Sequence, residues 1–389
     1  MPIKYSAFVD YSKLDPVKIE ALKLFGPTLD FPERLGISIV PETLGEAAVA
    51  FDLGGDFLLA ANVEGLGTKN RIADKMYSEV FVEKKRVAEG MNVKGLFRGL
   101  GQDTVAMSVN DLTSIGADPF AYFDIISCGN SEWFKDEERL RELLQGYRDA
   151  ADFCQLAIPQ GETPELRDVV NPDTLDLAGS SLGLIRPKGR LILGRNIQEG
   201  DVIYGLDSSG IHSNGLTKAR KIAERLPDGF FTKLANGRTL GEELLVPTYL
   251  YSPQIRRIFE ASIDVHYLQP ITGHGWEKIA RYRGKEFTYV ITSVPKPPLI
   301  FQELIRLAKK LNALESDPDK KFDVSDRENH FTWNMGVGYV LIAPEGQHDA
   351  IRRATHYDLG VYEIGHVESG PRQVVMPFEE GGKPVVYTP

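Results

Sequence analysis

Cysteine is scarce in this 389-residue chain, which contains only Cys128 and Cys154. Their separation matches neither a Cys-x-x-Cys pair nor metal-finger spacing, and a packed thiol is a simpler interpretation of Cys154 than a disulfide. The chain also lacks an apolar run of about 18 residues that could span a bilayer, and its first residues form no apolar signal segment. We therefore expect a cytoplasmic protein that has no membrane partner.

Excess positive charge is lacking as well. The chain has 45 Lys and Arg residues against 55 Asp and Glu residues, which gives a net charge of -10. No broad basic surface is available for nucleic acid, so an anionic ligand needs a local set of donors. The apolar share of 42% and the charged share of 26% are typical of a globular protein. A chain of this length favours two domains.

Strand-like and helix-like segments alternate in both halves of the chain, which predicts an α/β protein of the α+β type. The polar segment 186–190 contains both proline and glycine, and we place the domain boundary there, between residues 1–186 and 187–389. The expected strands are 47–53, 56–61, 104–109, 120–127, 175–185, 202–206, 287–292 and 336–342. The expected helices are 77–91, 136–156, 216–224 and 299–311, and the charged segment 316–329 is expected to be an exposed loop.

Residues 62–69 carry the first candidate site. An apolar strand precedes them and a helix can begin at Asn70, so this loop joins a sheet to a helix, where ligands often bind in α/β folds. Glu64 can hold a divalent cation, while Thr68 and Lys69 can bind phosphate groups. The spacing fits neither a Walker loop nor a dinucleotide fingerprint. A tight turn whose charges face water is the alternative.

A second candidate pair, Asn110 and Asp111, ends the β-like run 104–109. The pair could equally cap a following helix. With Glu64 at the same sheet edge, however, Asp111 supplies a second oxygen ligand for Mg²⁺ that bridges nucleotide phosphates.

Four further regions contain candidate polar groups. Residues 208–215 join a strand to a helix and can form an anion-binding nest. His212 in this loop is a candidate for proton transfer, although a hydrogen-bonding role is commoner for a lone histidine. Asp176 interrupts an apolar strand, where a buried carboxylate needs a partner, and Glu162 lies in what reads as an acidic loop. The nest contributes Ser209, Gly210, His212, Ser213 and Asn214, and the glycine-rich turn 270–277 adds Thr272 and Gly273.

Taken in order, segments 64–69, 109–112, 116–119, 161–163, 176–179, 208–215, 271–273 and 334–338 resemble the aminoimidazole ribonucleotide synthetase family, also called phosphoribosylformylglycinamidine cyclo-ligase. The resemblance implies a two-domain synthetase fold in which the N-terminal mixed sheet completes a β-barrel with a homodimer partner, and the C-terminal α/β domain covers the site. It implies a purine-biosynthesis enzyme that uses ATP to activate the formyl amide oxygen of formylglycinamidine ribonucleotide. The substrate's own amine then closes the imidazole ring, and ADP and phosphate are released.

The resemblance also implies roles for individual residues. Glu64 and Asp111 would bind Mg²⁺, Thr68 and Lys69 would bind the ATP phosphates, and Asn110 would bind one of these ligands. The loop from Ser209 to Asn214 would hold a phosphate, and Glu162 and Asp176 would be supporting carboxylates.

Several positions depart from the family pattern. The family usually has Asp at the position of Glu64, glycine at the position of His274, and a glycine-rich cover where this chain has residues 35–43. Two alternatives therefore remain. One is another ATP-using member of the superfamily, which includes thiamine-monophosphate kinase and selenophosphate synthetase; the other is a nucleotide-binding scaffold without turnover.

Overall fold

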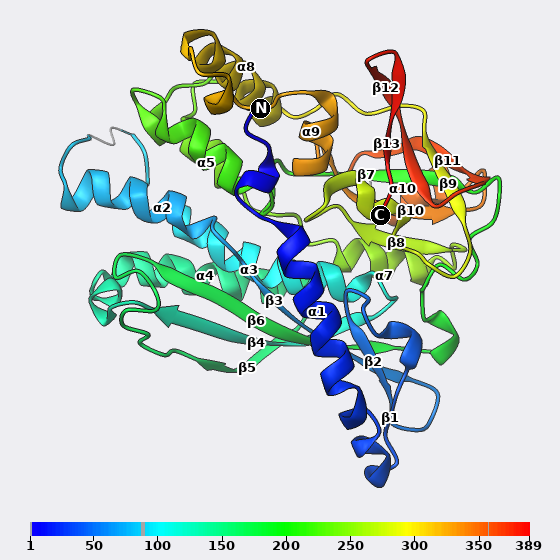
Figure 1. Ribbon diagram of the computed structural model, residues 1–389. Helices are drawn as coiled ribbons and strands as arrows, with labels where there is room; N and C mark the ends of the chain where they lie inside the picture. The colour runs from blue at the N-terminus through cyan, green and yellow to red at the C-terminus, as the bar shows by residue number, and fades with distance from the viewer. Residues whose placement is uncertain (1, 87–89, 357) are drawn as a thin grey trace.

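The computed structural model describes residues 2–86, 90–356 and 358–389. Two mixed β-sheets, each flanked by helices, make up the α/β fold (Figure 1). The first sheet has the strand order β1-β2-β3-β6-β4-β5, and the second has the order β13-β12-β9-β11-β7-β10-β8. No helix in the described part of the chain is long and apolar enough to cross a membrane.

The strands of the first sheet are β1 (Ser38–Ile39), β2 (Val49–Asp52), β3 (Leu58–Gly65), β4 (Asp118–Cys128), β5 (Ala157–Glu162) and β6 (Leu175–Ile185). Those of the second are β7 (Val202–Asp207), β8 (Tyr267–Pro270), β9 (Phe287–Ile291), β10 (Val337–Ala343), β11 (Val361–Ser369), β12 (Gln373–Glu380) and β13 (Lys383–Tyr387). The α-helices are α1 (Tyr11–Phe25), α2 (Asn70–Tyr77), α3 (Leu96–Thr113), α4 (Glu137–Cys154), α5 (Leu216–Glu224), α6 (Leu240–Leu244), α7 (Ser252–Glu260), α8 (Leu299–Leu314), α9 (Asp326–Thr332) and α10 (His348–Ala354).

The burial patterns of two strands explain how the sheets are covered. Along β6, buried side chains alternate with more exposed ones, so one face of the first sheet packs on helices while the other is left open. All seven residues of β10 are buried, because this strand lies between β7 and β8 and both faces of the second sheet are covered there. A strand that is buried on both faces needs apolar residues throughout, and the run 337–343 is apolar accordingly.

Helix α3 is the central helix of the first half, and it packs closely on α4. A Cβ atom at Gly146 would lie 1.8 Å from the carbonyl oxygen of Arg98, so only glycine permits this approach. Helix α3 also contacts α7 and β8, which follow it by more than a hundred residues. It therefore carries side chains from the first half into the contact with the second.

The structure corrects the prediction of a strand at 104–109, because these residues form the middle of α3. The helix is buried on most of its circumference, so its sequence shows no polar stripe of helical period. The β-branched residues Thr104, Val105 and Val109, which are common in strands, then favoured the prediction of a strand.

Two other predicted segments differ in their boundaries. The helix predicted at 77–91 does not form as one helix. Helix α2 already ends at Tyr77, and a short π-helix, Ser78–Val82, follows it. Residues 87–89 of that prediction lie outside the described residues. The loop expected at 316–329 contains the start of α9, whose first turn is capped by the Ser325 side chain accepting from the Glu328 N–H. The glycine-poor segment 35–43 forms β1 and a 3₁₀ helix, Pro41–Thr43.

The strand at 175–185 and the helix at 216–224 are confirmed at their predicted bounds. Cys128 and Cys154 are both buried free thiols, which confirms the packed-thiol interpretation.

Candidate active site

Glu64 and Asp111 lie next to each other, although they come from different elements. Glu64 sits in β3, which continues to Gly65, so the prediction of a loop beginning at residue 62 is wrong at that point. Asp111 sits in the last turn of α3. The Asn62 side chain ties the two elements together: its Nδ2 donates to the Ser108 carbonyl at 2.9 Å, and its Oδ1 accepts from the Ser108 hydroxyl at 2.7 Å.

The electrostatics of this carboxylate pair match its burial. Burial, and then the charge of Asp111, raise the pKa of Glu64 to about 7, and the two side chains share a hydrogen bond. Burial also raises the pKa of Asp111, while the cations of Lys278 and Arg281 oppose that shift. A proton or a cation between the two carboxyl groups removes the repulsion between their negative charges.

The pair has the chemistry of a partial Mg²⁺ site. Asp111 Oδ1 is buried without a hydrogen-bond partner in the described structure, so a ligand position is open. Nowhere in residues 2–86, 90–356 and 358–389 do three or more Asp, Glu, His or Cys side chains form a group that could hold a metal. Two carboxylates nevertheless fit Mg²⁺, which commonly takes one or two from the protein and its other ligands from phosphates and water.

Lys278 is a basic residue at this site that the sequence analysis did not single out. It follows the 270–277 turn in the 3₁₀ helix Gly275–Ala280, and its ammonium donates to the Thr272 hydroxyl. Burial lowers the pKa of Lys278, and the negative charges of Asp111 and Glu64 oppose that shift. Thr272 therefore accepts a hydrogen bond from a buried lysine. The phosphate contacts predicted for Thr272 and the adjacent Gly273 stay predictions.

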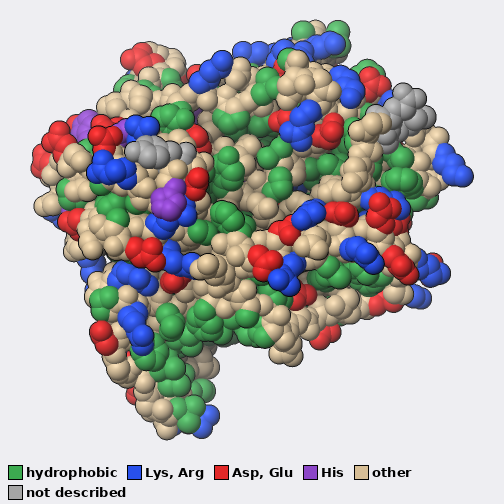
Figure 2. Space-filling view, turned by 180° about the vertical axis from the view of Figure 1, so that it is seen from behind, with side chains coloured by type: hydrophobic (Ala, Val, Ile, Leu, Met, Phe, Trp, Pro, Cys, Tyr) green, Lys and Arg blue, Asp and Glu red, His purple; other side chains and the backbone are tan. Residues whose placement is uncertain are grey.

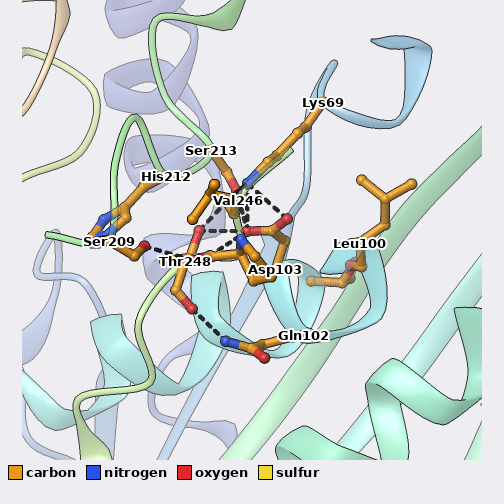
Figure 3. Close-up of polar contacts among 11 residues, drawn as sticks. Lys69, Leu100, Gln102, Asp103, Ser209, His212, Ser213, Val246 and Thr248 are labelled. Atoms are coloured by element: carbon orange, nitrogen blue, oxygen red, sulfur yellow. Dashed lines mark hydrogen bonds and ion pairs between the residues drawn. The ribbon is translucent and has the colours of Figure 1, made fainter. Parts of the chain in front are cut away.

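Lys69 points into a second buried cluster, drawn in Figure 3. Its ammonium lies 2.8 Å from Asp103 Oδ2 and donates to the Val246 carbonyl at 2.7 Å. Both charged side chains are completely buried. Asp103 also accepts from the Thr248 N–H at 2.7 Å and from the Thr248 hydroxyl at 2.6 Å. Because Asp103 is in α3 and Val246 and Thr248 follow α6, this cluster joins the two halves of the chain.

The phosphate role predicted for Lys69 stays a prediction, since the structure gives the ammonium protein partners. Burial lowers the pKa of Lys69, and the charge of Asp103 opposes that shift. Thr68, the neighbouring candidate, is half-buried in the turn between β3 and α2.

The 208–215 loop lies between β7 and α5, as predicted, and its hydroxyls bond to protein. Ser209 donates to the Pro247 carbonyl at 2.5 Å, and Ser213 donates to Asp103 at 3.2 Å. The Gly210 carbonyl accepts from Asn334 Nδ2 at 2.9 Å, which places segment 334–338 under the loop. Asn214 Nδ2 is buried without a hydrogen-bond partner in the described structure, so it is a donor available to a ligand.

His212 is buried and neutral. Its Nε2 accepts from the Ser209 N–H at 3.2 Å, which puts the ring proton on Nδ1. Burial, and then the charge of Lys69, lower the pKa of His212 to about 3. A histidine with this pKa carries almost no proton at neutral pH, so a hydrogen-bonding role suits it better than general acid catalysis.

Several predicted residues converge on one narrow cavity of about 10 Å³, the room for about one water molecule. Asn110, in α3, also binds the other half: its Nδ2 donates to the Tyr249 carbonyl at 2.7 Å and its Oδ1 accepts from the Tyr251 N–H at 2.9 Å. The lining residues include Asn110, Asp111, His212, Asn214, Thr248 and Thr272.

Two predicted carboxylates lie elsewhere. Asp176 is exposed on β6, so the expectation of a buried carboxylate is wrong: its side chain falls on the open face of the alternating strand. Glu162 is exposed at the end of edge strand β5, which replaces the predicted loop. Strands β6 and β4 separate β5 from β3, a spacing of about 14 Å at 4.8 Å per strand. Glu162 therefore does not join Glu64 through the sheet.

No sequence pattern pointed to Asp103, Thr248, Lys278 or Arg281. Asp103 lies about two helical turns before Asp111, immediately before the segment 104–109 that was predicted as a strand. Because this stretch was not predicted as a helix, the direction of the Asp103 side chain could not be predicted either. Lys278 and Arg281 look like ordinary surface cations in sequence, and their places next to the carboxylates arise only from the fold.

Known proteins share this arrangement of two halves. Residues 45–185 match the domain described as AIR synthase related protein, N-terminal domain, and residues 198–377 match the corresponding C-terminal domain. The chain belongs to the AIR synthase related family. It is 34% identical to a phosphoribosylformylglycinamidine cyclo-ligase from Methanocaldococcus jannaschii, covering 85% of this chain and 83% of that protein.

A second relative with the same name, from Thermococcus kodakarensis, is 32% identical over 94% of this chain and 95% of its own length. Among solved structures, the hydrogenase maturation protein HypE in complex with ATP aligns with a TM-score of 0.52 and 17% identity, covering 87% of this chain and 86% of HypE. At that identity the likeness shows a shared fold.

Proposed function

We propose that this chain is an ATP-dependent phosphoribosylformylglycinamidine cyclo-ligase, which converts formylglycinamidine ribonucleotide to aminoimidazole ribonucleotide in cytoplasmic purine biosynthesis. The curated relatives carry that name over most of both chains. The observation on the structure that carries the proposal is the convergence of Asp111, His212 and Thr272 on one cavity. These residues come from three separate segments of the family pattern, and a set of unrelated surface turns would not meet in this way.

Residues 1–186 supply the carboxylates and residues 187–389 supply most of the polar loops that face them. Glu64 and Asp111 hold Mg²⁺, which neutralises the phosphate charge of ATP when bound. The Nδ1–H of His212 and the Nδ2 group of Asn214 are neutral donors that orient a phosphate. Such a site acts by aligning the reactants and by complementing charge, and it needs no protein nucleophile.

A nucleotide needs more room than the cavity of about 10 Å³ offers, so binding requires the segments around it to move apart. Helix α1 does not line the cavity, but it lies beside the 270–277 turn, which does: Asp15 is 3.7 Å from Nε2 of His274 in that turn. We assign to α1 the covering position that the family's glycine-rich segment would occupy. In Figure 1 it runs down the front of the molecule, from near the contact of the two halves past the first sheet to the projecting lower end.

We also propose that the protein is a homodimer whose interface is the open face of the first sheet. Val63 and Ile125 are 70% and 38% exposed on that face. The register pairs Val63 with Ser180 and Ile125 with Ala178, two residues apart on β6, so both apolar side chains point the same way. An apolar sheet face of this kind is normally covered by a partner. Figure 2 shows further hydrophobic side chains on the projecting N-terminal arm at lower left.

The test is a turnover assay with purified protein, ATP, Mg²⁺ and formylglycinamidine ribonucleotide, in which ADP and the imidazole product are both followed. We expect one ADP for each imidazole formed, and an Asp111→Asn variant should lose both. Asp56→Asn, a change at an exposed carboxylate in the β2–β3 turn, is the control and should retain them. Release of ADP that does not depend on the ribonucleotide would contradict the proposal and favour another ATP-using activity; ATP binding without turnover would favour a scaffold.

A further inference from the structure

A cleft of about 390 Å³ lies on the outside of the molecule between α2 and α5, two helices that run near each other at the left of Figure 1. It shares no lining residue with the cavity at Asp111 and His212. Its lining combines apolar residues with four cations and two carboxylates. The lining residues are Arg71, Lys75, Glu79, Arg86, Arg220, Glu224, Leu226, Pro227, Gly229 and Phe230.

Two of the four cations are already neutralised by carboxylates. Lys75 lies 2.9 Å from Glu83 and 3.4 Å from Glu79. Arg86 lies 3.0 Å from Asp228 and also donates to the Pro227 carbonyl at 3.2 Å. These pairs leave Lys75 and Arg86 with little charge to offer a ligand.

The other two cations, Arg71 and Arg220, have no such partners. Within the described residues neither guanidinium makes an ion pair or a hydrogen bond to a carboxylate. The nearest acid on the same helix, Glu224, is held by Lys221 at 2.7 Å. Arg71 is exposed on α2, so one of the two cations is directly accessible from solvent.

Arg220 is the more informative of the pair. It is only 9% exposed, it lines the cleft, and its Nε atom is buried without an acceptor in the described structure. Burial, and then the charge of Arg71, lower the pKa of Arg220, while the charge of Glu224 opposes that shift. A buried guanidinium that faces a second cation is costly unless an anion joins them.

We propose that this cleft is an anion site that binds the phosphate group of a small phosphate monoester between Arg71 and Arg220. A guanidinium pair can hold phosphate oxygens through parallel charge-assisted hydrogen bonds. The organic part of the ester lies along Leu226 and Pro227. This site is independent of the catalytic function proposed above, because it uses none of the residues at the nucleotide cavity.

The test is equilibrium dialysis of the full-length protein with labelled inorganic phosphate and, separately, with phenyl phosphate, at constant ionic strength. Arg71→Gln should weaken one class of sites about tenfold or more while leaving any phosphate bound at the other cavity. Arg141→Gln is the matched control, since Arg141 is an exposed helical arginine on α4. Phenyl phosphate that binds more tightly than inorganic phosphate supports an ester as the ligand; tighter or equal binding of inorganic phosphate overturns that part.

The melting temperature of an Arg220→Gln variant tests the proposal independently. Removing an unpaired buried cation should raise the melting temperature of the ligand-free protein and abolish the additional rise that phosphate causes in the wild type. Phosphate and sulfate also stabilise proteins nonspecifically, and the same rise in the Arg141→Gln control measures that contribution. Unchanged phosphate binding in Arg71→Gln, or an equal loss in Arg141→Gln, would overturn the proposal.

Discussion

The buried pair of Lys69 and Asp103 gives the sharpest quantitative expectation. Both side chains are completely buried, and their charged atoms are 2.8 Å apart. Removing one member of such a pair leaves the other as an uncompensated charge, which costs about 3 to 5 kcal/mol of unfolding free energy. Asp103→Asn is the cleanest perturbation, because the amide oxygen still accepts from Thr248 while the negative charge is lost.

A double-mutant cycle separates the charge from the packing. Lys69→Met alone should also destabilise, since it leaves Asp103 charged and buried. The double variant, Lys69→Met with Asp103→Asn, contains neither charge and should lose clearly less than the two single losses added together. We expect a coupling free energy of about 2 kcal/mol or more, in the range measured for contacting residues and buried pairs.

Urea denaturation followed by tryptophan fluorescence measures these changes. Trp333 is buried and its indole N–H donates to the Gly215 carbonyl at 3.2 Å, so it reports on the loop that Asp103 supports. Additive single losses, within about 0.5 kcal/mol, would show that the two side chains do not act as a pair. Circular dichroism of each folded variant checks that the native helices remain.

Glu64, Lys278 and Val63 can each be tested by a single substitution. The pKa of Glu64 is raised from 4.5 to about 7, so between these pH values the folded state keeps a proton that the unfolded state has lost. The stability that this group contributes is complete below pH 4.5 and is lost as the pH rises through 7. Glu64→Gln should therefore reduce the dependence of the melting temperature on pH between 4.5 and 7. Lys278→Met should strengthen Mg²⁺ binding measured by calorimetry, because a competing cation beside Asp111 is gone; unchanged affinity would contradict this role. Val63→Lys should shift the protein toward monomer in sedimentation, whereas Val169→Lys, at an 81% exposed valine outside the strands, should not.

Local patterns predicted much of the fold. Residues 175–185 form a largely apolar run of strand length, and residues 216–224 follow a glycine with helical periodicity, so both were located at their observed bounds. Patterning failed at 104–109, where a buried helix has no polar face and its β-branched residues are common in strands. It failed again at Asp176, because an apolar strand does not say which of its faces is covered.

The order of the family segments can be read from the amino-acid sequence alone, and it indicates which residue types come together: the carboxylates, the hydroxyl-rich loop and the glycine-rich turn. These are properties of short stretches, and short stretches carry their own turn and strand preferences. Only the tertiary structure decided the partners. Lys69 faces Asp103 rather than solvent, Lys278 stands beside Glu64 and Asp111, and Arg71 meets Arg220 across a cleft. Each of these pairs joins residues far apart in the chain, and the electrostatic energy between them depends on distance and burial, which no local pattern contains.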